Sequence, residues 1–417
     1  MDRQVAYSTH VLEGEGLPSS RRGRLAQEDL FGYPQPIPSC NKGLKSHLSP
    51  LIKWPGGKER ELKHILPNLP EFVRYFEPFV GGGAVFMGVR AQEYYINDLS
   101  SELIALYHSV AATEPDFFRH AELIDTTWSK VTVFAMEHRE LGTIYKEYRD
   151  RGTGWGGLKQ ILDAFCRQYA SPLSAILGSE YSLWAEHFLE ETKVSLLRKM
   201  QRMCVLERER HPLPETDIEG NIETALKSAL YVTYRTMYND LTLAEKAPHL
   251  HTALFFFIRN YAYSGMFRYS VHGGFNVPYG GMAYNAKSLS KKLAYYRSSE
   301  LLDHLTTAQI YCLDFETFLR RCQPGEEDFI FLDPPYDSEF STYAQQPFDR
   351  MDQQRLADYL LQDCRAKWMM IIKNTDFIYS LYDREGIYIR SFEKSYQVSF
   401  MNRNERKVTH LLITNYL

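Results

Sequence analysis

The sequence predicts an α/β fold, in which a doubly wound parallel sheet is interrupted by a mainly helical insertion. Two observations predict the sheet: strand-like apolar runs alternate with helix-like segments in residues 48–110, and again in residues 301–417. The third observation is that residues 111–258, between these stretches, have helical spacing and few strand-like runs. A chain of 417 residues is long enough for one large α/β domain and a smaller inserted unit.

Residues 1–47 mix glycine, proline, serine and charged residues without a sustained period, so we expect a flexible leader. The alternation then begins with VRYFEPFVGGG, which predicts a strand ending in a glycine turn, and AVFMGVR, which predicts the start of a helix. A second strand follows in EYYINDLS and a second helix in SELIALYHSV. This order is typical of a doubly wound sheet.

The middle of the chain, residues 111–258, is rich in leucine, alanine, glutamate, lysine and arginine, as in ALKSALYVTYRTMY, and we interpret it as helical. Residues 260–281 are dense in glycine and tyrosine, and FNVPYGG predicts an extended segment closed by a turn. The sheet then resumes in AQIYCLDF, DFIFLDPPY and KWMMIIKNT. Near the carboxyl end, two further strands are predicted around a polar loop.

The composition, 44% hydrophobic and 24% charged, is that of an ordinary globular protein. No apolar run approaches the roughly 20 residues of a membrane helix, and the start of the chain lacks a secretory signal, so we expect a cytoplasmic protein without membrane contact. Neither a CxxC pair nor a His/Cys ligand spacing occurs, so we expect reduced, mostly buried thiols and no metal site. The cysteines are Cys40, Cys166, Cys204, Cys312, Cys322 and Cys364.

Basic and aromatic residues alternate in one local stretch of a chain whose net charge is −4. From residue 259 to residue 297 there are nine aromatic residues and no Asp or Glu. The basic residues of this stretch are Arg259, Arg268, Lys287, Lys291, Lys292 and Arg297. Such a patch fits contact with phosphates and stacking on bases, whereas a solvated hairpin whose tyrosines pack on the core is the alternative.

The strongest chemical signal is the motif Asp333, Pro334, Pro335 and Tyr336, which follows the apolar strand of residues 329–332. Ligands bind at the carboxyl ends of such strands, and the two prolines make the main chain rigid and remove two N–H donors. The lone pair of an amine attached to an aromatic ring is delocalised into that ring. Such an amine reacts better when two acceptors hold its two hydrogens, and Asp333 and the Pro334 carbonyl can be these acceptors. Tyr336 is then placed to stack on a flipped-out base. The alternative is an ordinary turn after a strand.

A second motif combines Phe79, Gly81 and Gly83 at the predicted strand-to-helix turn, where glycines let a cofactor approach the main chain closely. Asp98 ends the next strand, 15 residues after Gly83, where a carboxylate can accept the two hydroxyls of a ribose. Both features indicate a nucleotide-type cofactor. A plain structural turn, and a helix N-cap at Asp98, are the alternatives.

A third motif, LIKWPGGKERELKHILP, contains Gly-Gly-Lys but does not match a phosphate loop, because the first glycine is missing and Glu59 follows Lys58 in place of Ser or Thr. A loop that closes over a cofactor fits better. Lys53 and Lys58 are then placed to reach the cofactor or a DNA backbone, and solvated lysines are the alternative.

Taken together, these motifs resemble the Dam-type (D12 class, alpha-group) DNA adenine N6-methyltransferase family. KWPGGK is similar to the family's opening motif, EPFVGGGAVF to its cofactor glycine motif and IND to the acid that follows. The segment RNYAYSGMFRYSVHGGFNVPYG and the ending NERKVTHLLITNY are also similar to the family's. The motifs cover residues 49–110 and 258–417 in the family's order, and several motifs in one order are far more specific than any one.

The resemblance implies a Rossmann-like methyltransferase sheet with an inserted mainly helical domain and a DNA-recognition hairpin. The implied reaction moves a methyl group from S-adenosylmethionine, leaving S-adenosylhomocysteine, to the N6 amine of an adenine flipped out of double-stranded DNA, without a metal. The implied catalytic residues are Asp333, Pro334, Pro335 and Tyr336. The implied cofactor residues are Trp54, Gly56, Gly57, Lys58, Phe79, Gly81, Gly83, Asp98 and Asp314. The implied DNA contacts are Lys53, Tyr263, Arg268, Tyr269, Asn276 and Pro278.

Five parts of the chain follow from these motifs. Residues 1–47 form the leader, 48–110 the cofactor-binding half of the catalytic domain, 111–258 the helical insertion, 259–300 the target-recognition segment and 301–417 the half that carries Asp333. A companion restriction endonuclease is a candidate partner, since the family includes enzymes that act beside one. The expected state is a monomer or a weak dimer.

Two departures from the family pattern limit what is carried over. The stretch 111–258 is far longer than a compact member needs, and its role is open. Ser264 and Met282 replace an asparagine and an aromatic residue common in GATC-specific members, so we do not carry over GATC specificity. Two other classes are alternatives: a non-catalytic DNA-binding relative, against which the intact motifs argue, and methylation of cytosine N4, an RNA adenine or a protein glutamine. Asp333 before the prolines favours adenine.

Overall fold

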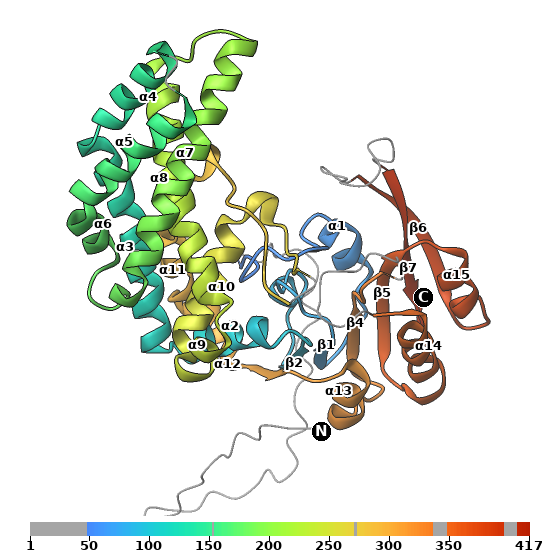
Figure 1. Ribbon diagram of the computed structural model, residues 1–417. Coiled ribbons are helices and arrows are strands. Elements are labelled where there is room, and N and C mark those ends of the chain that lie inside the picture. Colours follow the sequence, from blue (N-terminus) through green and yellow to red (C-terminus); the bar gives the residue numbers. More distant parts are fainter. Residues whose placement is uncertain (1–47, 152–153, 271–272, 337–347, 396–406) are drawn as a thin grey trace, which may run out of the picture. The chain divides into compact units, whose positions relative to one another are not determined.

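The computed structural model describes residues 48–151, 154–270, 273–336, 348–395 and 407–417 of the chain. Its centre is a seven-stranded sheet with the order β3-β2-β1-β4-β5-β7-β6 (Figure 1). The strands are β1 (Arg74–Glu77), β2 (Glu93–Asn97), β3 (Ala308–Tyr311), β4 (Phe329–Leu332), β5 (Lys367–Lys373), β6 (Tyr388–Ser395) and β7 (Lys407–Thr414). Neighbours from β3 to β5 are parallel, whereas β7 runs against both of its neighbours. The predicted α/β sheet, mostly parallel, is therefore confirmed.

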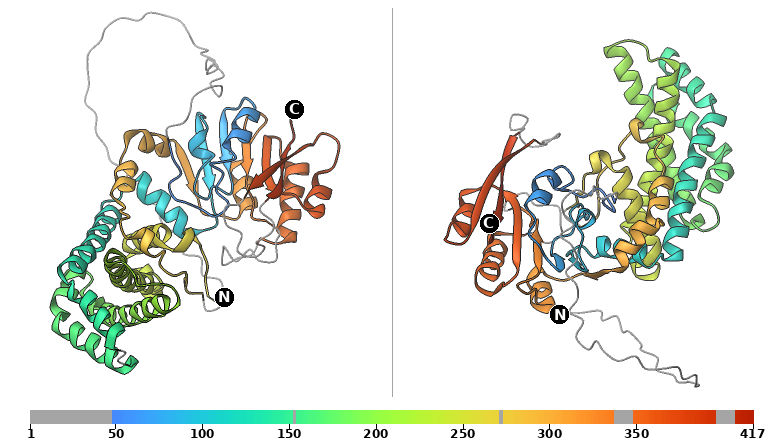
Figure 2. Two further views of the ribbon diagram at one scale, coloured as in Figure 1. Left: turned by 90° about the horizontal axis from the view of Figure 1, so that it is seen from above. Right: turned by 180° about the vertical axis from the view of Figure 1, so that it is seen from behind.

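Helices cover both faces of this sheet (Figure 2). Along β4, Phe329 and Phe331 belong to one apolar cluster, whereas Ile330 and Leu332 belong to a second cluster on the opposite face. The first cluster includes α2 (Ser101–Ala111) and α12 (Ser299–Thr306), and the second includes α13 (Phe315–Cys322), α14 (Arg350–Asp358) and α15 (Asp376–Tyr382). Because both faces are covered, every side chain of β4 is buried, which explains the uninterrupted apolar run in its sequence.

One predicted helix is wrong. After the glycine turn the chain forms only a short 3-10 turn, Phe86–Gly88, in place of the helix expected from AVFMGVR. The imidazole of His304 bonds to the Phe86 carbonyl at 3.0 Å, which occupies the acceptor that a continuing helix would use. Gly88 and the β-branched Val89 are also poor helix formers, and Val89 is extended.

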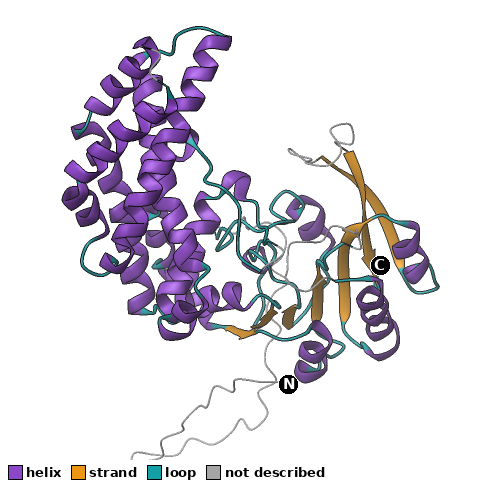
Figure 3. Cartoon of the chain, viewed as in Figure 1, coloured by secondary structure: helices purple, strands orange, loops and turns teal. Residues whose placement is uncertain are grey.

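Helices fill most of the chain between β2 and β3 (Figure 3). In α3, Phe117, Ala121, Ile124, Trp128 and Val131 repeat every three or four residues and are buried. These side chains belong to the same cluster as one face of the sheet, so helices and sheet share a core. The predicted helices are thus present, and the division of the chain into domains stays a prediction. They are α3 (Pro115–Glu137), α4 (Glu140–Arg151), α5 (Trp155–Gln168), α6 (Ala170–Leu177), α7 (Ala185–Glu209), α8 (Glu215–Tyr238), α9 (Leu241–Lys246) and α10 (Pro248–Tyr261).

The chain between α10 and α11 (Ser290–Tyr296) folds back on itself. Its described residues form two isolated antiparallel bridges, Ala262 with Tyr279 and Tyr269 with Phe275, in place of a regular pair of strands. The extended run predicted for FNVPYGG is present, because Phe275, Val277 and Tyr279 are buried while the residues between them are exposed. The hairpin prediction thus stands only as this irregular fold-back.

The described cysteines are all free thiols, as expected. Their burial was predicted less well, because Cys166 and Cys204 are buried but Cys312 is exposed. Cys40 and the leader of residues 1–47, which was predicted to be flexible, lie outside the described residues. Among the helices that are described, none is both long and apolar enough to cross a membrane.

Candidate active site

The carboxyl ends of β1 and β4 meet at one point of the sheet. These strands are parallel neighbours, with Tyr75 opposite Phe329 and Phe76 opposite Ile330. The chain leaves β1 toward β2 and β3 on one side, whereas β4 and β5 lie on the other, so the strand order reverses here. In an open α/β sheet, ligands bind in the crevice at such a switch point. The turn that begins at Asp333 lies directly after β4, at this edge.

Lys58 forms an ion pair with Asp333, with 2.5 Å between Nζ and Oδ2. Lys58 is almost fully buried and also donates to the Gly56 carbonyl at 2.8 Å. The Gly-Gly-Lys loop, predicted to close over a cofactor, therefore reaches Asp333, the first residue of the predicted catalytic motif. A buried ammonium group is costly unless it is paired, so the pairing also restrains the Asp333 carboxylate. The alternative of a solvated lysine is wrong for Lys58.

Two buried side chains hold the rest of the motif. Gln353 on α14 donates from Nε2 to the Pro335 carbonyl at 2.8 Å. The Tyr336 hydroxyl lies 3.0 Å from Nε2 of His410 on β7, within hydrogen-bond distance. Neither partner was predicted from the sequence. His410 left a faint signal, because it immediately precedes the apolar run of residues 411–413 in β7, whereas the position of Gln353 depends on how α14 packs.

Glu77, at the end of β1, is a third buried group that the motifs did not single out. Its carboxylate accepts a hydrogen bond from the Tyr75 hydroxyl at 2.8 Å. Burial raises the pKa of Glu77 well above 4.5; the bond from Tyr75 opposes this rise, and the nearby charge of Asp333 adds to it.

Asp98 connects the glycine turn to α2. Its carboxylate accepts the main-chain N–H of Gly81 at 3.0 Å and that of Ser100 at 3.0 Å. Burial raises the pKa of Asp98 above its usual value, against these hydrogen bonds, which lower it. The N-cap of α2 is Ser100, whose hydroxyl accepts from Leu103, so the N-cap alternative for Asp98 is wrong.

The glycines of this turn are required by close packing as well as by backbone conformation. Gly81 and Gly83 have φ of +48° and +79°, which favour glycine. A Cβ atom on Gly81 would lie 2.7 Å from the Trp54 ring, and one on Gly83 would lie 2.4 Å from the Tyr107 hydroxyl. Trp54, predicted to bind the cofactor, thus packs against the turn that is predicted to do the same. The exposed Gly56 and Gly57 lie in the loop between Trp54 and Lys58.

An aromatic cluster lies beside the glycine turn. The ring of Phe79 lies 5.6 Å from those of Phe315 and Phe348, measured between centroids. Asp314, immediately before Phe315, caps α13 by accepting two main-chain N–H groups and forms an ion pair with Arg355 at 2.9 Å. The structure therefore brings Phe79 and Asp314, predicted from motifs more than 200 residues apart, into one neighbourhood.

Asn97 holds this neighbourhood together from the end of β2. Its side-chain amide donates to the carbonyls of Pro78, at 3.0 Å, and Leu313, at 2.9 Å, and accepts the Leu313 N–H at 2.8 Å. Asn97 is fully buried, and it links the turns after β1 and β3. It immediately precedes Asp98 in the motif IND, which is the signal that could have identified it.

The residues predicted to contact DNA differ in their exposure to solvent. Arg268 and Asn276 are exposed and paired, with 3.0 Å between Nε and Oδ1, and Pro278 is exposed on the same extended run. Tyr263 is 46% exposed. Tyr269, by contrast, is partly buried, and its hydroxyl lies 3.2 Å from that of Tyr238, so it faces the protein.

Four of the six basic residues in this stretch contact groups of the protein itself, and phosphate contact by the stretch stays a prediction. Lys287 donates to the Asn260 carbonyl and Lys292 to the Pro50 carbonyl, and burial lowers the pKa of both amines, that of Lys292 to about 8. Arg297 pairs with Glu122 at 2.6 Å. The exposed basic residues that remain for a ligand are Arg268 and Lys291.

Arg259 is the clearest case, because its guanidinium is buried between two segments. It donates to the Lys53 carbonyl at 2.8 Å and to the Met266 carbonyl at 3.4 Å. It also lies over the rings of Phe267, at 4.4 Å, and Trp54, at 5.0 Å. Burial lowers the pKa of Arg259 to about 10, so the side chain stays charged at neutral pH. Arg259 therefore joins Lys53, which precedes the Gly-Gly-Lys loop, to Met266 in the recognition segment. The Lys53 side chain itself is exposed.

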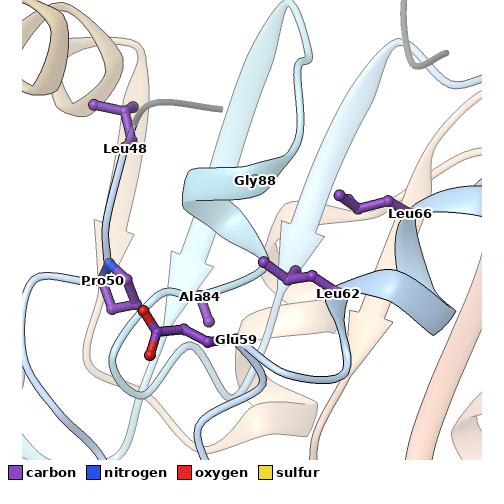
Figure 4. A pocket seen from close by; sticks show the side chains of 7 residues that line it. All are labelled: Leu48, Pro50, Glu59, Leu62, Leu66, Ala84 and Gly88. Atoms are coloured by element: carbon purple, nitrogen blue, oxygen red, sulfur yellow. The ribbon is translucent and has the colours of Figure 1, made fainter. Parts of the chain in front are cut away.

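A separate cavity of about 250 Å³ is lined by residues that precede and follow the Gly-Gly-Lys loop and by two residues that follow the glycine turn (Figure 4). Its lining is mainly apolar, and Glu59 is the charged side chain among its residues. These residues are Leu48, Pro50, Glu59, Leu62, Leu66, Ala84 and Gly88. None of these residues is among the predicted catalytic, cofactor-binding or DNA-contact residues. The cavity is therefore distinct from the predicted site at the sheet edge.

The chain is similar to known proteins over most of its length. The model of the D12 class N6 adenine-specific DNA methyltransferase family matches residues 54–140 and 216–395. Type II methyltransferase M.CviBI of Paramecium bursaria Chlorella virus NC1A is 24% identical over 88% of this chain and 100% of its own. Type II methyltransferase M1.LlaDCHI of Lactococcus lactis subsp. cremoris is 24% identical over 89% and 97%. The DNA adenine methylase of Escherichia coli (strain K12) is 21% identical over 87% and 93%.

Proposed function

Because the chain belongs to the D12 class N6 adenine-specific DNA methyltransferase family, we propose that the turn after β4 holds the target adenine and that the glycine turn beside it binds S-adenosylmethionine. The observation that carries this proposal is the position of Asp333, directly after β4 at the switch point of the sheet. Asp98 and Gly81 follow the two adjacent strands on one side of it. Cofactor and substrate groups thus converge on one edge.

The residues at the glycine turn suit S-adenosylmethionine, which enzymes of this family use in general. The Asp98 carboxylate is the group that accepts ribose hydroxyls, and the Phe79 cluster is an aromatic surface for the adenine ring, with Asp314 beside it. When bound, the cofactor supplies an electrophilic methyl group. The other proposed cofactor residues are Trp54, Gly56, Gly57, Lys58, Gly81 and Gly83.

Asp333 and Pro334 act on the substrate amine. The lone pair of the adenine N6 atom is delocalised into the ring, and acceptors for both of its hydrogens favour the more nucleophilic, pyramidal form. The Asp333 carboxylate accepts one hydrogen and the Pro334 carbonyl the other. Lys58 holds Oδ2 of Asp333 and so orients the carboxylate before the substrate arrives.

Tyr336 stacks on the flipped-out adenine, and Pro335 fixes the turn between it and Asp333. The contact with His410 restrains the Tyr336 hydroxyl, and the bond from Gln353 restrains the Pro335 carbonyl. A ring that is already held at its polar end loses less conformational freedom when a base stacks on it. Base flipping is required because the N6 atom is otherwise inside the duplex.

Double-stranded DNA is contacted by the exposed side chains of the recognition segment. Arg268 is the main candidate for a base contact, with Asn276, Pro278 and Tyr263 around it. Lys53 is suited to a phosphate contact, and Tyr269 supports the segment from inside. The Type II names of two relatives fit a role in restriction and modification beside a companion endonuclease, with the enzyme acting as a monomer or a weak dimer.

The decisive test uses Asp333→Ala and Asp333→Asn in the full chain. Methyl transfer from labelled S-adenosylmethionine to duplex DNA is measured, and N6-methyladenine is identified in the digested product. We expect a loss of at least about a thousandfold for both variants, because the acceptor charge acts where the reaction occurs. Cofactor affinity, measured by calorimetry, is expected to stay within a few-fold.

Asp303→Ala, at an exposed carboxylate on α12, is the control and is expected to retain full activity. Asp333→Asn guards against unfolding, since it keeps the shape of the side chain beside Lys58. Near-normal turnover of either Asp333 variant would contradict the assignment. A wild-type product other than N6-methyladenine would contradict the adenine substrate.

A further inference from the structure

Polar side chains along one side of α8 bond to the recognition segment. These side chains, which we call the α8 stripe, are Thr224, Lys227, Tyr231, Arg235 and Asn239, the last at the carboxyl end of the helix. They are spaced by three or four residues and therefore lie on one face of the helix, over about 22 Å at 1.5 Å per residue. Each of them bonds to at least one residue between 275 and 285.

Asn239 bonds to both main-chain groups of Phe275. Its Nδ2 donates to the Phe275 carbonyl at 3.0 Å, and its Oδ1 accepts the Phe275 N–H at 2.8 Å. A side-chain amide that pairs in this way takes the place of a neighbouring β-strand. An extended segment without regular strand partners needs such groups, because its buried main-chain donors and acceptors must otherwise go unpaired.

Tyr231 and Arg235 continue the pattern two residues further along the segment. The buried Tyr231 hydroxyl donates to the Val277 carbonyl at 3.0 Å, and Arg235 donates to the same oxygen at 3.2 Å. Two donors on one carbonyl hold residue 277 firmly. Since residues 275 and 277 are both held through their main chain, the side chain of Asn276 between them faces solvent.

The amino-terminal half of the stripe holds Asn285, further along the segment. Lys227 donates to the Asn285 carbonyl and pairs with Glu223 at 3.0 Å. The Asn285 side chain in turn bonds to the Thr224 hydroxyl at 3.0 Å and accepts the Tyr279 hydroxyl at 3.0 Å. The stripe therefore holds the segment at Phe275, at Val277 and at Asn285.

These contacts decide which residues of the segment face outward. Phe275, Val277 and Tyr279 are buried, whereas Asn276 and Pro278 are exposed. Because side chains alternate in an extended chain, a shift of one residue would bury the exposed pair and expose the buried residues. Arg268, which bonds to Asn276, would then lose its partner.

We propose that the α8 stripe sets the register of the recognition segment and thereby determines which DNA sequence the enzyme methylates. The proposal rests on the proposed function, because it assumes that this segment contacts DNA. It also assigns a task to the long helical stretch: α8 is the rigid template on which the segment is built. The stripe residues are positioning residues and need not touch DNA.

The test compares stripe variants with matched variants of the same helix. Tyr231→Phe removes one buried hydroxyl, and Asn239→Ala removes the paired amide. The first control is Tyr234→Phe, since Tyr234 is a buried tyrosine that packs on Tyr181 and Phe257. The second control is Asn221→Ala, since the Asn221 amide bonds within α8, to the Asp217 carbonyl.

Three quantities are measured on the full chain: kcat/KM at the preferred site, the ratio of methylation at that site to sites with one altered base pair, and the affinity for S-adenosylmethionine. For each stripe variant we expect a roughly tenfold loss of kcat/KM, the effect of about one hydrogen bond, and a reduced site ratio. Cofactor affinity is expected to be unchanged, and the controls are expected to behave like the wild type.

Hydrogen exchange in the peptide spanning residues 273–287 supplies a readout that needs no activity. Exchange is expected to be faster in Asn239→Ala, because the Phe275 N–H loses its acceptor. An unchanged site ratio in both stripe variants, or exchange equal to that of the controls, would overturn the proposal. If the wild type methylates no DNA, the proposed function fails instead, and the exchange experiment still decides whether the stripe holds the segment.

Discussion

The carboxyl edge of the sheet and the recognition segment organise their side chains in different ways. At the sheet edge, the proposed functional groups follow directly on short buried strands: Asp333 on β4 and Asp98 on β2. In the recognition segment, regular strands are absent from the described residues, and the main chain is held by side chains of α8 and by Arg259. Position along the chain therefore predicts position in space at the sheet edge, but not in the segment.

Charged residues also have different roles in the two regions. At the sheet edge, the charged groups that the motifs identified gather where the chemistry was expected, and Lys58 pairs with Asp333. In the recognition segment, a basic residue can equally be a structural donor to a main-chain carbonyl, as Arg259 and Lys292 are. Charge alone separates these roles poorly, because an irregular segment must satisfy its carbonyls from side chains.

The largest expected effect is at the glycine turn. In Gly83→Ala, the new Cβ atom would lie 2.4 Å from the Tyr107 hydroxyl, at a φ of +79°. Overpacking and the positive φ together should lower the free energy of unfolding by about 4 kcal/mol and abolish cofactor binding. Urea unfolding and calorimetry check both. Tyr107→Phe in the same chain should recover part of the loss, and Gly156→Ala, where the new atom meets nothing within 4 Å, should be neutral.

Arg259→Met tests whether a basic residue of the recognition segment is structural. The variant keeps an apolar stem but leaves the Lys53 and Met266 carbonyls without their donor. We expect the free energy of unfolding to fall by about 3 kcal/mol, as for other buried hydrogen-bonded groups, and both DNA and cofactor affinity to weaken. Arg297→Met, at an exposed ion pair, is the control. A stable Arg259→Met variant that loses only DNA affinity would place Arg259 in the DNA interface instead.

Arg268→Ala tests the opposite role in the same segment. Arg268 is exposed, so its loss should leave unfolding unchanged while weakening DNA binding by about 1 to 3 kcal/mol and relaxing the choice of base at one position. Binding to duplexes that differ at single base pairs measures this effect. Lys291→Ala, at the other exposed basic residue, should weaken binding to all sequences alike. If Arg268→Ala changes neither affinity nor site choice, recognition lies elsewhere.

The smallest expected effect is the pH dependence of stability that arises from His304, which bonds to the Phe86 carbonyl. Burial lowers the pKa of His304 from 6.5 to about 4, so between these values the unfolded chain binds a proton that the folded chain does not. The stability that the neutral His304 imidazole contributes is complete above pH 6.5 and is lost progressively as the pH falls toward 4. At pH 5.5 the loss should be about 1 kcal/mol. In urea unfolding, His304→Gln should lose less stability between pH 7.5 and pH 5.5 than the wild type. Equal pH dependence in His304→Gln and the wild type would contradict this account.

Much of the sheet and its edge could be predicted from the sequence. The strands at the centre of the sheet, β4 and β5, contain uninterrupted apolar runs, and the motifs at strand ends carry residues whose chemistry is specific. The helix expected after the glycine turn does not form: Gly88 and Val89 are poor helix formers, and the Phe86 carbonyl bonds to His304, more than 200 residues away. Gln353, His410 and Asn97 were missed for a related reason: each acts through a hydrogen bond to a distant turn.

The sequence by itself determined the family and most of the order of strands and helices, because local patterns and short motifs carry that information. Only the tertiary structure decided that Lys58 pairs with Asp333, that Arg259 is buried between two segments, and that α8 bonds to the recognition segment. The physical reason is the same in each case. A buried polar group must find a partner, and which partner is within reach depends on the packing of residues far apart in the chain.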